Sequence, residues 1–195
     1  MDVIAPDRGS ITGQGPGPSA VVAYATLFGA TEHVARLVAQ ALAEFTGQGV
    51  RAVDLAYLDV STLAGHDLIV VGACTWNVGQ LPPDLESSLE ALGALDLRGR
   101  HVALFGTGDQ IGYPDTFVDA IGVMADTFSG TGARLVGRWP AGEYDIVASR
   151  ALVGGEELLG LALDEDNEPD LTQRRVASWV AQVAAEAGFR DRVSI

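Results

Sequence analysis

The sequence predicts an α/β protein, in which a doubly wound, five-stranded parallel sheet lies between two layers of helices. Apolar runs of strand length alternate along the chain with stretches whose apolar residues recur at helical spacing. The strand-like runs are apolar on both faces, which is typical of a parallel sheet covered by helices on each side. Right-handed crossovers between such strands produce a sandwich of three layers.

The expected elements follow one another from residue 20 onward. Strands are expected at 20–25, 51–55, 67–73, 101–105 and 133–137. Helices are expected at 34–45, from Pro82 to 92, after Pro114 to 128, and at 176–187. The stretch 139–170 interrupts this alternation and is too long for a simple loop. Its apolar run 158–163 could resume the fifth strand after an insertion.

The composition is that of one globular domain. The chain has 195 residues, of which 48% are hydrophobic and 19% charged. Residues 1–19 are rich in Gly, Pro and Ser, so we expect a flexible N-terminal tail followed by a folded domain at 20–195. We see no secretory signal and no apolar run long enough for a membrane span, and therefore expect a cytoplasmic protein without membrane contact.

The net charge of −14 bears on the choice of partner. It argues against nucleic acid and against an anionic membrane surface. Either it favours a basic partner that is steered electrostatically, or it only aids solubility, and charge alone does not decide between the two. All twelve basic residues are Arg, which excludes a P-loop lysine, a Schiff base and a lysine general base.

Metal sites and nucleophilic catalysis are not supported. The three His residues are scattered, without Cys or His at ligand spacing. Residues 164–168 begin like a calcium loop, but Pro169 stands where Gly is needed and Arg175 where Glu is needed. Cys74 is the only cysteine and is expected to be a small buried side chain. No nucleophile motif is present, so we expect no catalytic residue.

The functional site is expected in three loops that follow the first, third and fourth strands, because ligands of open α/β sheets bind beyond the carboxyl ends of the strands. The first loop reads Thr26-Leu27-Phe28-Gly29-Ala30-Thr31 and leads into a helix, whose unpaired N–H groups favour a phosphate. The loop lacks the glycine spacing for dinucleotides and a Lys for nucleoside triphosphates, so a terminal phosphate fits better. The alternative is that Thr31 only caps the helix.

The other two loops each contain an aromatic residue. They read Thr75-Trp76-Asn77-Val78-Gly79 and Thr107-Gly108-Asp109-Gln110-Ile111-Gly112-Tyr113. Trp76 and Tyr113 are placed to cover both faces of a planar ligand, although either one alone could be a surface packing residue. The three loops together favour a single binding site.

These loops resemble those of long-chain flavodoxins. The similar strings are Thr75–Gly79, Gly106–Tyr113 and Gly160–Asn167, and the likeness spans residues 21–188. The stretch 139–170 matches the insertion in the fifth strand that separates long-chain from short-chain members. The resemblance implies a flavodoxin-like fold with the family's strand order, 2-1-3-4-5.

The resemblance also implies one FMN, bound without a covalent link. Its phosphate would lie in the first loop and its isoalloxazine between Trp76 and Tyr113. The pyrimidine edge would face the backbone around Thr107, Gly108 and Asp109, near Thr116 and Gly112.

Two further positions match family features. The Asn77–Val78 peptide, next to the pliable Gly79, matches the peptide whose carbonyl accepts from the flavin N5–H of the semiquinone. Asp166 matches an acidic position near the ribityl chain. In contrast, Phe28 replaces the middle hydroxyl residue of the family's phosphate loop. Thr116 and Val118 stand where long-chain relatives often carry Asn and Gln near the pyrimidine edge.

The function implied is that of a low-potential, one-electron carrier that shuttles between semiquinone and hydroquinone. It would be a monomer that meets basic redox partners, such as a ferredoxin/flavodoxin-NADP reductase and an acceptor enzyme. Asp109, Asp166 and the absence of basic residues in the loops would lower the semiquinone/hydroquinone potential. One alternative is an FMN-dependent NAD(P)H quinone reductase, which needs room for nicotinamide over the flavin. The other is a phospho-receiver, which needs an acidic cluster after the first strand, an Asp after the third and a Lys after the fifth, whereas this chain has Thr26, Cys74 and no Lys.

Overall fold

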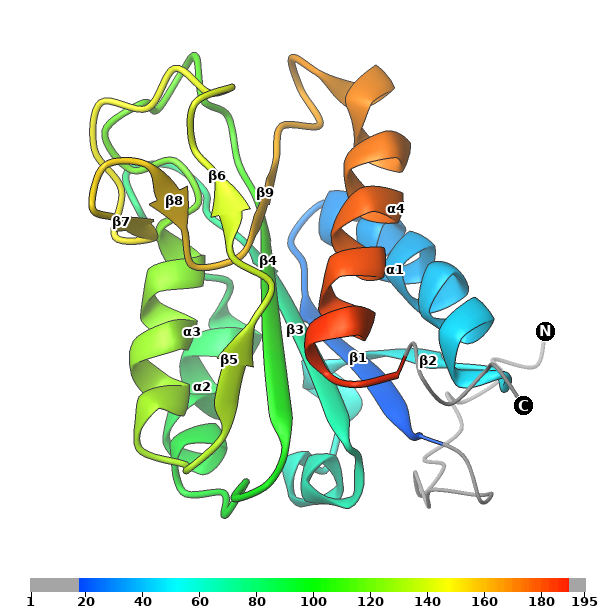
Figure 1. Cartoon of the computed structure of the whole chain (residues 1–195). Helices are drawn as coiled ribbons and strands as arrows, with labels where there is room; N and C mark the ends of the chain where they lie inside the picture. The colour runs from blue at the N-terminus through cyan, green and yellow to red at the C-terminus, as the bar shows by residue number, and fades with distance from the viewer. Residues whose placement is uncertain (1–17, 190–195) are drawn as a thin grey trace, which may run out of the picture.

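Five parallel strands form the centre of the molecule, and their order confirms the prediction. The computed structural model describes residues 18–189. The strands lie in the order β2-β1-β3-β4-β5 (Figure 1). Their bounds are β1 Ala20–Ala25, β2 Arg51–Asp54, β3 Leu68–Cys74, β4 His101–Thr107 and β5 Arg134–Val136. β1 and β3 lie inside this order and are buried along almost their whole length, which explains their continuous apolar sequence.

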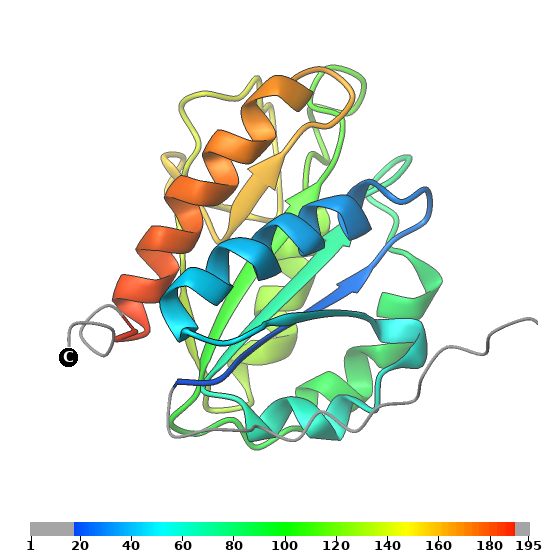
Figure 2. The ribbon, with the colours of Figure 1, turned by 90° about the vertical axis from the view of Figure 1, so that its right-hand side faces the viewer.

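Helices cover both faces of the sheet, as expected for three layers. α1 (Ala30–Thr46) and α4 (Pro169–Glu186) lie side by side on one face, and α2 (Pro83–Gly93) and α3 (Asp119–Ser129) lie on the other (Figures 1 and 2). The predicted proline at the start of α2 is confirmed. Across residues 18–189, no helix combines the length and apolar character that a bilayer span requires.

The segment between β2 and β3 contains two 3₁₀ helices that the hydrophobic pattern did not predict. They are η1 (Leu55–Tyr57) and η2 (Val60–Gly65). The Asp54 and Asp59 carboxylates each accept the backbone N–H two residues later, at 3.0 Å, and so cap these short turns. Leu55 and Leu63 are buried in the core, but these local caps, which the apolar pattern does not record, begin the two turns.

The fifth strand is interrupted, which confirms the predicted insertion. β5 pairs with residues 101–103 of β4, and β9 (Leu161–Leu163) pairs with residues 105–107 of the same strand. Between them, β6 (Trp139–Pro140), β7 (Leu152–Val153) and β8 (Glu157–Leu158) form a small antiparallel sheet beside the carboxyl end of β4 (Figure 1). The insertion therefore lies at the end of the sheet where the three loops gather.

The predicted tail at 1–19 falls mostly outside the described residues. Pro18 and Ser19 are described, and both contact the fold. The Pro18 carbonyl accepts from the Gln48 side chain at 3.1 Å, and the Ser19 hydroxyl donates to Asp67 at 3.0 Å. These contacts place Pro18 and Ser19 in the folded part.

Gly160 permits β9 to return to β4. A Cβ at this position would lie 2.2 Å from the Leu104 carbonyl oxygen, a backbone atom that cannot move aside without disturbing the strand. We expect Gly160→Ala to lower the free energy of unfolding by about 2–3 kcal/mol, measured by urea denaturation. Gly142→Ala is the control, because a Cβ there meets nothing within 4 Å. Equal stability of the two variants would contradict the close approach.

His66, at the amino end of β3, gives the fold a pH dependence. The side chain is buried, its Nδ1 has no partner within residues 18–189, and burial lowers the pKa of the imidazole despite the nearby Asp67. Because the unfolded chain takes up the proton first, stability should be complete above about pH 6.5 and decline as the pH falls below it. We expect His66→Gln to flatten the decline of unfolding free energy between pH 7 and 5. The same substitution at the exposed His33 is the control for the effect of replacing a histidine.

Candidate functional site

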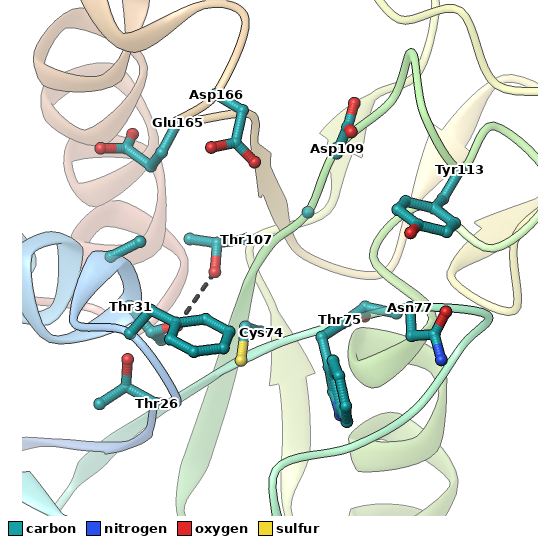
Figure 3. Close-up of a pocket in the computed structure, with 14 residues that line it drawn as sticks. Thr26, Thr31, Cys74, Thr75, Asn77, Thr107, Asp109, Tyr113, Glu165 and Asp166 are labelled. Atoms are coloured by element: carbon teal, nitrogen blue, oxygen red, sulfur yellow. Dashed lines mark hydrogen bonds between the residues drawn. The ribbon is translucent and has the colours of Figure 1, made fainter.

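A cavity of about 280 Å³ lies at the carboxyl ends of β1, β3 and β4, where the three loops were expected to meet. The predicted residues that line it are Thr26, Phe28, Ala30, Thr31, Thr75, Trp76, Asn77, Thr107, Gly108, Asp109, Tyr113 and Asp166. Figure 3 shows Thr26 and Thr31 at one side of this cavity and Tyr113 and Asn77 at the other. The predicted Leu27, Gly29, Val78, Gly79, Gly112 and Thr116 do not line it.

The first loop makes a tight turn into α1. Gly29 has a φ of 94°, and its N–H donates to the Thr26 hydroxyl at 3.0 Å. A left-handed conformation of this kind favours glycine, so Gly29 shapes the loop without lining the cavity. α1 begins at Ala30, and its first N–H groups have no acceptor within the helix. An anion beside this turn would provide acceptors for them.

Thr31 does not cap the helix, so that alternative is wrong. The N-cap position belongs to Gly29. The Thr31 hydroxyl is buried and lies 3.0 Å from the hydroxyl of Thr107 at the end of β4 (Figure 3). This hydrogen bond joins the first and third loops across the floor of the cavity.

The second loop is a short reversal that presents Trp76. Trp76 and Gln80 exchange backbone hydrogen bonds at 3.1 and 2.9 Å. The reversal places Asn77 at a φ of 47° and Gly79 at 75°, and the Asn77 carbonyl accepts from the Gly79 N–H at 3.1 Å. Trp76 at the start of this reversal is 42% exposed and does not pack into the core.

The third loop is organised by Asp109. Its carboxylate accepts from the N–H groups of Gly112 at 2.7 Å and Ile111 at 3.0 Å, and from the Asn167 side chain at 2.9 Å. These bonds hold the pKa of Asp109 below its usual range, and the bond from Gly112 has the largest effect. Gly112 thus supports Asp109 and lies outside the cavity lining. The Tyr113 ring is 41% exposed, close to the value for Trp76.

The flavodoxin family model matches residues 22–179. This chain belongs to the flavodoxin family. It is 41% identical to the flavodoxin of Synechococcus elongatus over 167 residues, which are 85% of this chain and 96% of that protein. It is 37% identical to flavodoxin 1 of Escherichia coli over 159 residues, 81% and 88% of the two chains.

The fold also matches a solved flavodoxin structure. The Fusobacterium nucleatum flavodoxin bound to flavin mononucleotide superimposes with a TM-score of 0.79 at 24% identity, covering 86% of this chain and 97% of that one. The match supports the sheet order and the helical layers described above.

Two residues of this flavodoxin site were missed from the sequence. Glu165 lines the cavity and accepts a hydrogen bond from the Thr172 hydroxyl. It directly precedes the predicted Asp166, which was the available signal. Cys74, expected to be buried, is only partly buried because it ends β3 at the cavity, and burial raises the pKa of its thiol.

The charge of the flavodoxin site is negative. Asp109, Glu165 and Asp166 line the cavity, whereas no Arg or His among residues 18–189 does. Glu32 in the first turn of α1 pairs with Arg36, which lies outside the lining. An anionic ligand would therefore depend on backbone N–H groups and hydroxyls for its stabilisation.

Proposed function

We propose that this flavodoxin binds one FMN without a covalent link and carries single electrons at low potential. The observation that carries the proposal is the arrangement of one cavity. A glycine-containing turn at a helix start lies at one side, and two half-exposed aromatic rings, Trp76 and Tyr113, lie in the other two loops. A phosphate fits the first feature and a planar ring the second.

The individual roles follow the positions of the residues. We assign the phosphate to the turn at 26–31, including the Thr26 and Thr31 hydroxyls. We assign the isoalloxazine to the space between Trp76 and Tyr113. Its polar edge would meet backbone groups at 107–109. Gly108 lets the Phe117 ring pack closely against this backbone, because the ring lies 3.2 Å from the position of a Cβ. Phe28 provides no hydroxyl, so one phosphate contact is absent.

The protein's own groups would set the potential of the bound FMN, which supplies the redox chemistry. Asp109, Glu165 and Asp166 place negative charge around the cavity, and no cation of the described part of the chain lines it. Negative charge disfavours an anionic reduced cofactor and lowers its potential. The Asn77 carbonyl accepts from the Gly79 N–H in this structure, and it is proposed to accept a hydrogen bond from an N–H of the cofactor instead.

Redox partners of basic character are proposed to dock over this cavity in the cytoplasm. Each of the three loops contains an exposed apolar side chain. These are Phe28 (89% exposed), Val78 and Ile111. The net charge of −14 favours positively charged partners such as a flavodoxin reductase and an acceptor enzyme. We propose that the carrier is a monomer.

An anaerobic reductive titration of the purified protein tests the function. We expect yellow protein that is reduced in two separated one-electron steps, with an intermediate spectrum between them. Reduction in a single two-electron step, with rapid bleaching by NADPH alone, would favour a quinone reductase. Colourless protein that takes up no added FMN would refute the proposal.

Salt should strengthen FMN binding to the apoprotein. The phosphate is a dianion, the lining side chains are negative and the protein carries −14, so screening reduces a repulsion. We expect the FMN dissociation constant to fall about 3- to 10-fold between 10 and 300 mM NaCl, measured by quenching of flavin fluorescence. Riboflavin, which lacks the phosphate, is the control and should change little. Weaker FMN binding at high salt would mean that a cation contacts the phosphate.

A further inference from the structure

Arg175 of α4 is a buried cation outside the cavity lining. Its side chain is 3% exposed. Nη1 lies 2.7 Å from Oε2 of Glu168, and Nη2 lies 3.5 Å from Oε2 of Glu143 in the insertion. The guanidinium carbon lies 4.7 Å from the centre of the Tyr144 ring, also in the insertion. Arg175 thus connects the start of α4 to the insertion.

A second set of hydrogen bonds continues from Glu168 to the third loop. The same Glu168 oxygen accepts from the Gln110 side-chain amide at 3.1 Å. The Gln110 side-chain oxygen accepts from the Asp145 N–H of the insertion at 3.1 Å, and the Gln110 N–H donates to Asp164 at 3.1 Å. Gln110 is 4% exposed and lies between Asp109 and Tyr113 in sequence. The loop is therefore tied through Gln110 to both α4 and the insertion.

The insertion is itself fixed at the residue that Arg175 contacts. The Tyr144 hydroxyl donates to the Ala162 carbonyl of β9 at 2.7 Å and accepts from the Trp139 indole at 2.9 Å. Its ring also packs against Phe117, with centroids 5.5 Å apart. The guanidinium covers one more side of this ring. A planar cation suits the position because it can contact two carboxylates and an aromatic ring at once, which an ammonium group cannot do as well.

We propose that Arg175 is a positioning residue of the flavin site, which fixes the loop of Asp109 and Tyr113 through Glu168 and Gln110 and makes the insertion a support of that loop. The inference rests on the proposed function, because it assumes that FMN lies against this loop. Without Arg175, the Glu168 carboxylate loses its cationic partner and attracts the Gln110 amide alone. Because Arg175 no longer holds the Glu168 carboxylate in place, the acceptor of the Gln110 amide can move, and the loop of Tyr113 is less ordered.

The test compares Arg175→Met and Arg175→Lys with Arg100→Met. Arg100 pairs with Asp67 at 2.8 Å at the opposite end of the sheet, so its loss changes the net charge equally without touching the network. In the apoprotein we expect amide exchange of residues 108–113 to be about tenfold faster in Arg175→Met. In the holoprotein we expect about tenfold weaker FMN binding and shifted potentials. Arg175→Lys should lie between, and Arg100→Met within about twofold of the wild type.

Three other outcomes distinguish a failure of this proposal from a failure of the proposed function. If Arg175→Met lowers only the urea midpoint, while loop exchange, FMN affinity and potentials stay at wild-type values, Arg175 is merely structural and the proposal fails. If Arg175→Met does not fold, Gln110→Ala decides, because it leaves the Arg175–Glu168 pair in place. Wild-type exchange and affinity in Gln110→Ala would then overturn the proposal. If the wild-type protein binds no FMN, the proposed function fails, but loop exchange still decides the role of Arg175.

Discussion

Replacing Asp164 with Ala should lower the free energy of unfolding by about 3–5 kcal/mol. The Asp164 side chain is fully buried. Its two oxygens accept from the N–H groups of Gln110, Asp166 and Asn167 at 3.0–3.2 Å, and from the Asn167 side chain at 2.8 and 3.1 Å. Alanine leaves the three backbone N–H groups without this acceptor, whereas the Asn167 side chain keeps its bond to Asp109 at 2.9 Å. The buried bond from Gln110 should contribute most, because an unpaired buried donor costs more than the net value of the bond lost.

Urea denaturation at neutral pH measures this effect. Asp164→Asn retains one acceptor oxygen and nearly the same volume, so we expect an intermediate loss. Asp126→Ala is the matched control, because it removes the same charge from a side chain that is 77% exposed. That variant should stay within about 0.5 kcal/mol of the wild type. A loss of similar size in the Asp164 and Asp126 variants would show that the buried hydrogen bonds contribute little.

The fold could be predicted because its determinants are local along the chain. The buried strands β1 and β3 are continuous apolar runs, and the stripe of α4 residues that includes Val176, Trp179 and Val183 is buried against the sheet. The interruption of the fifth strand was visible as a break in this alternation. The 3₁₀ helices between β2 and β3 were not predicted, since side-chain caps at Asp54 and Asp59 shape them.

The site could be predicted only as far as loop position determines it. Strand ends brought Thr26, Trp76 and Tyr113 to one cavity. Which loop residues line the cavity depends on turns whose geometry the pattern does not reveal, such as the left-handed Gly29 and the hydrogen bonds from Gly112 to Asp109. These residues shape the loops from outside the lining.

Contacts between distant segments could not be predicted at all. The Thr31–Thr107 hydrogen bond joins residues 76 positions apart, and the Gln110–Glu168 bond joins residues 58 positions apart. No periodicity records such pairs. Arg175 was noted in the sequence only as an argument against a calcium loop, whereas its burial and its two carboxylate partners emerge only from packing.

Removing either aromatic ring should weaken FMN binding and change its potentials. Trp76 and Tyr113 line the same cavity, and both are half exposed, which leaves ring surface available to a planar ligand. We expect Trp76→Ala to raise the FMN dissociation constant about 10- to 100-fold, and Tyr113→Ala about tenfold, through lost stacking and lost burial. In the proposed site the rings would also keep water from the cofactor. Their removal should therefore ease formation of an anionic reduced state and raise the potential of the second electron by about 30–60 mV.

Fluorescence titration of the apoprotein measures the affinities, and spectroelectrochemistry measures the two potentials. Trp76→Phe keeps an aromatic ring and should recover most of the affinity. Tyr57→Ala is the control, because Tyr57 is an exposed aromatic residue on η1 that does not line the cavity. It should leave affinity and potentials at wild-type values. If Trp76→Ala and Tyr113→Ala both kept wild-type potentials, the charges and backbone of the site would set them alone, and the assignment of these rings to tuning the cofactor would be wrong.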